Sequence, residues 1–266
     1  MPAKFIAIGD IAGKIGRRAI VEVLPSWKKK YRPDLVIANA ENIAHGSGMT
    51  RKTLAEVQQA GVDIFTSGDH AFRKPEASEI MIDEASSLIR PANYPTGTIG
   101  PGVKIANLGN KKVLVVNLLG QVFIKEAVNN PFTAFNEIYQ QHHQSVDAIL
   151  VDFHAEATSE KIAMGWHVAG RAEALWGTHT HVMTADERIL EEHTAYITDI
   201  GMTGERDSVI GVKKDIILNN FLEKDTIHHD FAETGWARVD GIYFEIDLDE
   251  RKAVKIMRLS EAVEIK

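Results

Sequence analysis

The chain has 266 residues, no cysteine and a formal net charge of −7, with 44% hydrophobic and 25% charged residues. These values predict a globular protein that buries a large core in a single domain over residues 1–266. The acidic balance argues against bulk nucleic-acid binding through a basic surface, and the lack of cysteine excludes disulfides, thiolate metal sites and cysteine nucleophiles. No signal-peptide pattern opens the chain and no apolar run approaches the roughly 20 residues that span a membrane, so we expect a cytoplasmic protein without a membrane partner.

Short apolar runs alternate with helix-like segments along the chain. The predicted strands are residues 5–8, 35–38, 62–65, 113–117, 148–151, 174–176 and 195–197. The predicted helices are residues 16–31, 51–60 and 74–88, the last with a break after Pro75. This alternation is typical of an α/β fold with a largely buried sheet.

The remaining segments are assigned from their turn residues and their periodicity. Residues 91–109 are rich in proline and glycine and predict an extended loop, the best candidate for a cap or rim over a site. Residues 212–223 predict an amphipathic helix. Residues 241–247 and 253–259 alternate as strands do.

Polar side chains follow five of the predicted strands at the point where each strand ends. Ligands of open α/β sheets bind outside the carboxyl ends of the strands, so these groups are expected to converge. The candidate donors are Asp10, Glu41, Asn42, Asp69, His154, His179 and His181.

This mixture of imidazole and carboxylate suits manganese, iron, cobalt or zinc better than magnesium or calcium alone. Seven donors exceed the needs of one four-coordinate zinc and suit two ions about 4 Å apart with a bridging carboxylate. Taken singly, each group has an ordinary structural reading: Asp10 suits a turn, and Glu41 or Asp69 suits a helix cap. Taken together, they favour a metal site.

Four further residues near the predicted ligands are weaker candidates. His45, in a glycine-containing loop, is a candidate substrate contact or a plain loop residue. Arg17, near the start of a helix, is expected to contact either a phosphate or an acidic neighbour. Glu156 and Arg171 lie close to ligands in the sequence and are expected to support them.

Several blocks of the sequence form a recognisable set of motifs: Gly9-Asp10-x-x-Gly13-x-x-Gly16-Arg17, Asn39-Ala40-Glu41-Asn42, Gly68-Asp69-His70 and residues 152–161, 177–186 and 198–204. Together they resemble the YmdB-like branch of the calcineurin-like metallophosphoesterases. The resemblance runs from the first strand to about Gly211 and agrees with the length of the chain.

The resemblance implies a four-layer α/β/β/α sandwich and a phosphodiesterase that acts on small phosphate esters, with 2′,3′-cyclic nucleotides as the expected substrates. Most metallophosphoesterases have a histidine two residues after the first aspartate, where this chain has Ala12. In this branch Asn42 is expected to fill that coordination position. By motif matching, Glu41 would bridge two metals, one held by Asp10 and His181 and the other by Asp69, His154 and His179.

The implied reaction is an in-line attack on phosphorus by a hydroxide that bridges two metals, with His70 protonating or hydrogen-bonding the leaving oxygen. Iron or manganese is expected, with zinc or cobalt as alternatives, and a homo-oligomer is left open. The family pattern has asparagine where this chain has Asp69, and the added negative charge predicts tighter metal retention and either a slower reaction or a shifted pH optimum.

Two rival functions stay open at this stage. One is a regulatory protein whose metal site binds a nucleotide with little turnover. The other is a different metal hydrolase such as an amidohydrolase, which would need more strand–helix repeats and usually a bridging lysine.

Overall fold

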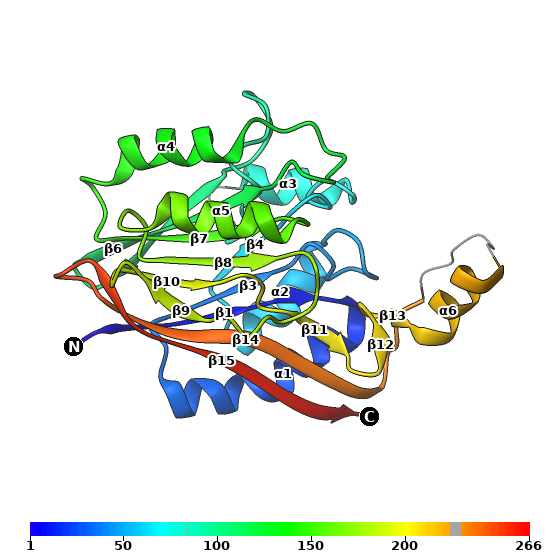
Figure 1. Ribbon diagram of the computed structural model, residues 1–266. Coiled ribbons are helices and arrows are strands. Elements are labelled where there is room, and N and C mark those ends of the chain that lie inside the picture. Colours follow the sequence, from blue (N-terminus) through cyan, green and yellow to red (C-terminus); the bar gives the residue numbers. More distant parts are fainter. Residues whose placement is uncertain (84, 224–229) are drawn as a thin grey trace.

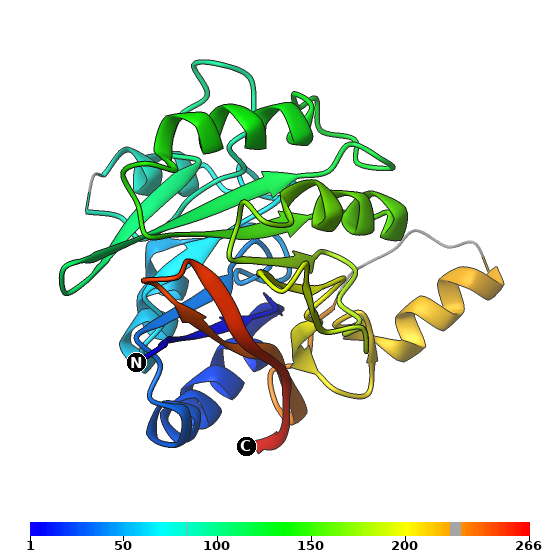
Figure 2. The ribbon, with the colours of Figure 1, turned by 60° about the vertical axis from the view of Figure 1, so that its left-hand side comes forward.

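The computed structural model describes residues 1–266 apart from 84 and 224–229. Two β-sheets pack face to face, and helices cover the outer face of each sheet (Figure 1; Figure 2 shows the same layers from a second direction). These layers confirm the α/β/β/α sandwich that the resemblance implies.

The first sheet joins the two ends of the chain. Its parallel strands are β1 (Ala3–Ile8), β3 (Leu35–Asn39) and β4 (Ile64–Thr66). Antiparallel to β1 runs β14 (Gly235–Asp247), which also pairs with β15 (Lys252–Ile265) and β11 (Met202–Glu205). The short β2 (Asp10–Ile11) pairs with β11.

The second sheet has a parallel centre and antiparallel edges. Its central strands are β6 (Lys111–Leu119), β7 (Ala148–His154), β8 (Ala174–Thr178) and β10 (Thr194–Ile197). The edges are β5 (Val103–Leu108) and β9 (Arg188–Leu190). A separate two-stranded ribbon consists of β12 (Ser208–Val209) and β13 (Val212–Lys213).

Strand β1 illustrates why the central strands read as continuous apolar runs. Ile6 and Ile8 pack towards the helices, whereas Phe5 and Ala7 face the core between the sheets. Both faces of the strand are buried, so no polar alternation is left in its sequence. Phe244 stacks on Phe5 with ring centroids 5.1 Å apart and packs against Trp176 of the other sheet at 5.8 Å. This aromatic contact joins the two sheets.

The helices divide between the two outer faces. The first sheet is covered by α1 (Gly13–Tyr31), α2 (Arg51–Ala60) and α3 (Glu76–Ile82). The second sheet is covered by α4 (Pro131–His142) and α5 (Thr158–Val168). In Figure 1, α6 (Lys214–Glu223) extends away from the sheets. In the described part of the chain, no helix combines the length and the hydropathy needed to cross a membrane.

The predicted strands and α2 are confirmed, and several boundaries are corrected. The loop predicted over residues 91–109 is wrong at its end, because Val103–Leu108 is β5. This strand lies at a sheet edge and has no fully buried residue, so its sequence lacks an apolar run. Helix α3 ends at Ile82 rather than at 88, and the first two residues of the predicted helix 212–223 belong to β13. Helices α4 and α5 were not predicted.

The aromatic contact between the sheets generates a stability prediction. We expect Phe244→Ala to lower the free energy of unfolding by about 3–5 kcal/mol, because it opens a cavity where both sheets meet. Phe221→Ala is the matched control, since that ring is 82% exposed and should change stability by no more than about 0.5 kcal/mol. Urea unfolding followed by circular dichroism measures both. Equal losses for the two variants would contradict this view of the core.

Candidate functional site

The structure brings all seven predicted ligands together at the carboxyl ends of strands from both sheets. Asp10 belongs to β2, Glu41 and Asn42 follow β3, and Asp69 follows β4. His154 ends β7 and pairs with Thr178, after which the chain continues to His179 and His181. The five positions predicted from strand ends therefore converge because the strands are neighbours in two facing sheets.

Four of these groups form a compact cluster. The ligand atoms of Glu41, Asp69, His154 and His179 all lie within 4.8 Å of one another. His154 Nε2 is central: it lies 3.1 Å from Glu41 Oε2, 3.3 Å from Asp69 Oδ1 and 3.0 Å from His179 Nδ1. Such spacing lets one cation contact all four groups.

The other three predicted ligands adjoin this cluster. His181 Nε2 lies 3.8 Å from Asp10 Oδ1 and 3.2 Å from Asn42 Nδ2. The Asn42 amide also donates to Glu41 Oε1 at 3.0 Å. Glu41 thus lies between the two groups of side chains, as expected for a bridging carboxylate.

A chain of hydrogen bonds fixes the ring of His154. The Thr178 hydroxyl donates to Asp152 Oδ1 at 2.7 Å, so its oxygen accepts from His154 Nδ1 at 2.9 Å. Thr66 donates to the other oxygen of Asp152. Because Nδ1 donates to this hydroxyl, Nε2 of His154 is the nitrogen that points at the carboxylates of the cluster.

The other two histidines are oriented in the same way. His179 Nε2 lies 3.1 Å from Glu156 Oε2, which leaves its Nδ1 lone pair facing His154. His181 Nδ1 donates to the carbonyl of Ile210 at 2.8 Å, which leaves its Nε2 facing Asp10. An outer nitrogen beside an oxygen acceptor, with the inner nitrogen facing the cluster, is the arrangement that metal-binding histidines show.

The backbone around the cluster is specialised. A Cβ atom on Gly68 would lie 2.2 Å from His154 Cδ2 and 2.3 Å from Glu41 Oε2, so only glycine lets this chain pass. His179 and His181 have φ values of 97° and 63°, in the left-handed region that side-chain-bearing residues rarely adopt. The chain bends at His179 and Thr180, so these two histidines do not continue the extended strand.

The charges of the site call for a cation. Asp10 Oδ1 and Asp69 Oδ1 are buried and have no hydrogen-bond partner in the part of the chain that the structure describes. Burial raises the pKa of Asp10 despite the nearby imidazoles of His181 and His154. Burial alone would lower the pKa of His154, yet the carboxylates of Glu41, Asp69 and Asp10 hold it well above its usual value. Carboxylate oxygens and imidazole lone pairs directed at one point fit a divalent transition metal.

His70 lies at the rim of this cluster. Its side chain is 29% exposed, and its Nδ1 donates to Asn42 Oδ1 at 2.8 Å. Its backbone N–H donates to Glu41 Oε2 at 3.2 Å, and its Nε2 lies 3.6 Å from Asp69 Oδ2. The ring is therefore held beside the cluster, and its Nε2 has no hydrogen bond to any of the described residues.

The four weaker candidates have different surroundings in the structure. Arg17 is buried against an acidic neighbour, with its Nε 2.6 Å from Glu56 Oε2, so the phosphate alternative has no support. His45 is exposed and lines a cavity of about 470 Å³, and its role in substrate binding stays a prediction. Glu156 contacts a predicted ligand as expected, whereas Arg171 donates to Asn136 away from the cluster.

Thr178 and Asp152 are functional candidates that the sequence reasoning missed. Asp152 stands two residues before His154 on β7, so strand periodicity places both on one face. The spacing of Asp152 and His154 could therefore have identified Asp152 from the sequence. The sequence carries no sign of the contact with Thr178, because Thr178 belongs to a different strand.

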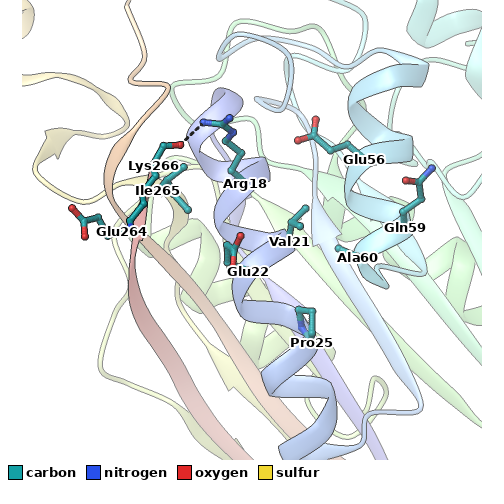
Figure 3. Close-up of a pocket in the computed structure, with 10 residues that line it drawn as sticks. All are labelled: Arg18, Val21, Glu22, Pro25, Glu56, Gln59, Ala60, Glu264, Ile265 and Lys266. Atoms are coloured by element: carbon teal, nitrogen blue, oxygen red, sulfur yellow. Dashed lines mark hydrogen bonds between the residues drawn. The ribbon is translucent and has the colours of Figure 1, made fainter.

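A groove elsewhere in the molecule has no part in this chemistry. It has a volume of about 840 Å³ and lies between α1, α2 and the end of β15 (Figure 3). Arg18 reaches the carbonyl of Lys266 across it, and none of the seven predicted ligands lines it.

The chain is similar to known proteins over nearly its whole length. The chain is 42% identical over 256 residues to the 2′,3′-cyclic-nucleotide 2′-phosphodiesterase of Bacillus subtilis, covering 96% of each chain. The crystal structure of a novel phosphatase from Mycoplasma pneumoniae superposes with a TM-score of 0.92 at 35% identity and covers 100% of this chain and 95% of that one.

A solved structure with lower sequence identity shares the fold of this chain, which carries no conclusion about activity. A putative 5′-nucleotidase from Staphylococcus aureus matches with a TM-score of 0.63 at 15% identity, covering 100% of this chain and 54% of that one.

The family model described as YmdB-like protein matches residues 6–259. The chain therefore belongs to the family of YmdB-like proteins, as the motifs at its strand ends indicated.

Proposed function

We propose that this protein is a metal-dependent phosphodiesterase that hydrolyses small phosphate esters, with 2′,3′-cyclic nucleotides as its substrate class. The observation that carries the proposal is the orientation of three histidine rings, each with its outer nitrogen beside an oxygen acceptor and its inner nitrogen facing the cluster. The name of the Bacillus subtilis relative supports the substrate class.

The side chains suit a pair of ions with Glu41 between them. We expect Asp10, Asn42 and His181 on one side and Asp69, His154 and His179 on the other. When bound, two divalent ions, with iron or manganese expected, would supply positive charge for the phosphoryl group and a water acidic enough to attack phosphorus at neutral pH.

The chain's own groups then have separate tasks. As the imidazolium, His70 carries a proton on both ring nitrogens: Nδ1 donates to Asn42 Oδ1, and Nε2 is placed to give its proton to the leaving oxygen, which leaves the neutral ring. Asp152, acting through Thr178, keeps His154 in the tautomer that binds a metal. Burial raises the pKa of Asp152 to about 6, so its carboxylate is still largely ionised at pH 7.

Metal removal tests the proposal. The protein purified without chelator should contain about two transition-metal ions per chain and hydrolyse 2′,3′-cyclic AMP. Chelation should abolish turnover, and added manganese should restore it. Elemental analysis and chromatography of the nucleotide product measure these outcomes. Bound metal and nucleotide without product would favour the regulatory alternative, and protein that takes up no metal on reconstitution would refute the site.

His70→Ala separates proton transfer from metal binding. We expect kcat for 2′,3′-cyclic AMP to fall by about 100-fold or more with metal content unchanged. His142→Ala, on α4, is the control and should match the wild type in both. If His70→Ala loses metal together with activity, the ring is a ligand or a structural group instead.

Asp69→Asn tests the charge that this chain adds to the family pattern. Asp69 faces His154, His70 and His179, whose charges and hydrogen bonds outweigh burial and keep its pKa low. Removing one negative charge should weaken metal retention during dialysis by about tenfold and raise the rate with excess metal. Asp147→Asn, at the opposite end of β7, is the control. Unchanged retention and rate would show that the extra charge has no effect.

A further inference from the structure

A buried ion pair lies behind the segment that carries two of the predicted ligands. Lys161 on α5 and Asp199 after β10 are each 1% exposed, and Lys161 Nζ lies 2.6 Å from Asp199 Oδ2. Removing two charges from water is costly, and a hydrophobic pair of similar volume is often no less stable. The pair therefore calls for an explanation other than general stability.

Asp199 binds the histidine segment directly. The oxygen that meets Lys161 also accepts from the Thr180 hydroxyl at 2.7 Å and from the Thr180 backbone N–H at 3.3 Å. Thr180 stands between His179 and His181. The second oxygen of Asp199 accepts from the backbone N–H of Gly201 at 2.8 Å, which fixes the plane of the carboxylate.

The same aspartate holds the far end of the segment through its backbone. Thr184 donates its N–H to the carbonyl of Asp199 at 3.1 Å, and its hydroxyl oxygen accepts from the N–H of Asp199 at 3.0 Å. The turn from 180 to 184 is therefore closed on one residue. Such closure is needed because His179 and His181 both have a left-handed φ, which an unrestrained chain would relax.

The route of the lysine is also specified. A Cβ atom on Gly177 would lie 3.0 Å from Lys161 Cδ and 1.8 Å from the carbonyl oxygen of Thr198. A glycine at the end of β8 thus lets the lysine stem pass under the strand to reach Asp199. These groups lie behind the ligands, since Thr180 presents its hydroxyl to Asp199 while the flanking histidines face the cluster.

We propose that Asp199, neutralised and oriented by Lys161, is the positioning group that holds His179 and His181 in their metal-binding geometry through Thr180. This role rests on the proposed metal site. It predicts that breaking the link at Thr180 disturbs the metal site even when the fold is intact.

Thr180→Val is the sharpest test, because it removes the hydroxyl and preserves the shape and the ion pair. We expect the affinity for Co²⁺ to fall by about 10- to 100-fold and the visible absorption spectrum of the cobalt-loaded protein to change. The urea midpoint should stay close to that of the wild type. Thr194→Val is the matched control: its buried hydroxyl donates to the carbonyl of Ala172 at 2.6 Å at the start of β10. Its Co²⁺ affinity and spectrum should be those of the wild type.

The double variant Lys161→Met/Asp199→Asn tests the charge without leaving a buried ion unpaired. It should also bind Co²⁺ more weakly. Wild-type affinity and spectrum in Thr180→Val would overturn the positioning role, whether or not the double variant folds. A wild-type protein that takes up no Co²⁺ would instead overturn the proposed function and this role with it.

Discussion

The orientation of the histidine rings is the constraint on which the site depends. An imidazole can ligate a metal only from the nitrogen that carries no proton, and the sequence does not say which nitrogen that is. Thr178 and the carbonyl of Ile210 accept from the outer nitrogens of His154 and His181, and Glu156 lies 3.1 Å from the outer nitrogen of His179. Each acceptor comes from a segment that the fold places behind the cluster. The geometry of the ligands therefore depends on residues that do not themselves face the cluster.

The two facing sheets position both the ligands and the side chains that orient them. Strands β7 and β8 bring Asp152, His154 and Thr178 to the same end of one sheet, while β3 and β4 bring Glu41 and Asp69 to the same end of the other. The apolar contacts of Phe244 hold the sheets at a fixed separation. Core packing therefore sets the distance across which carboxylates from one sheet meet imidazoles from the other.

The site is assembled at a cost to stability. Three carboxylates lie close together, two of their oxygens lack hydrogen-bond partners among the described residues, and two histidines adopt a left-handed backbone. Each feature is unfavourable by itself, and a bound divalent cation would relieve the first two. The core of two sheets covered by helices is large enough to tolerate such a region. Groups that oppose folding in this way concentrate where a protein performs its chemistry.

The amino-acid sequence was sufficient to predict the central strands, because burial on both faces leaves an apolar run, and to predict the candidate ligands, because parallel strands end at one edge. It did not reveal β5, whose order comes from pairing with β6, and it left two alternatives for Arg17 that only the contact with Glu56 resolved. The bond from Thr178 to Asp152 and the bond from Thr180 to Asp199 join residues 26 and 19 positions apart. Local propensity carries no signal for such contacts, since they exist only once the strands have packed.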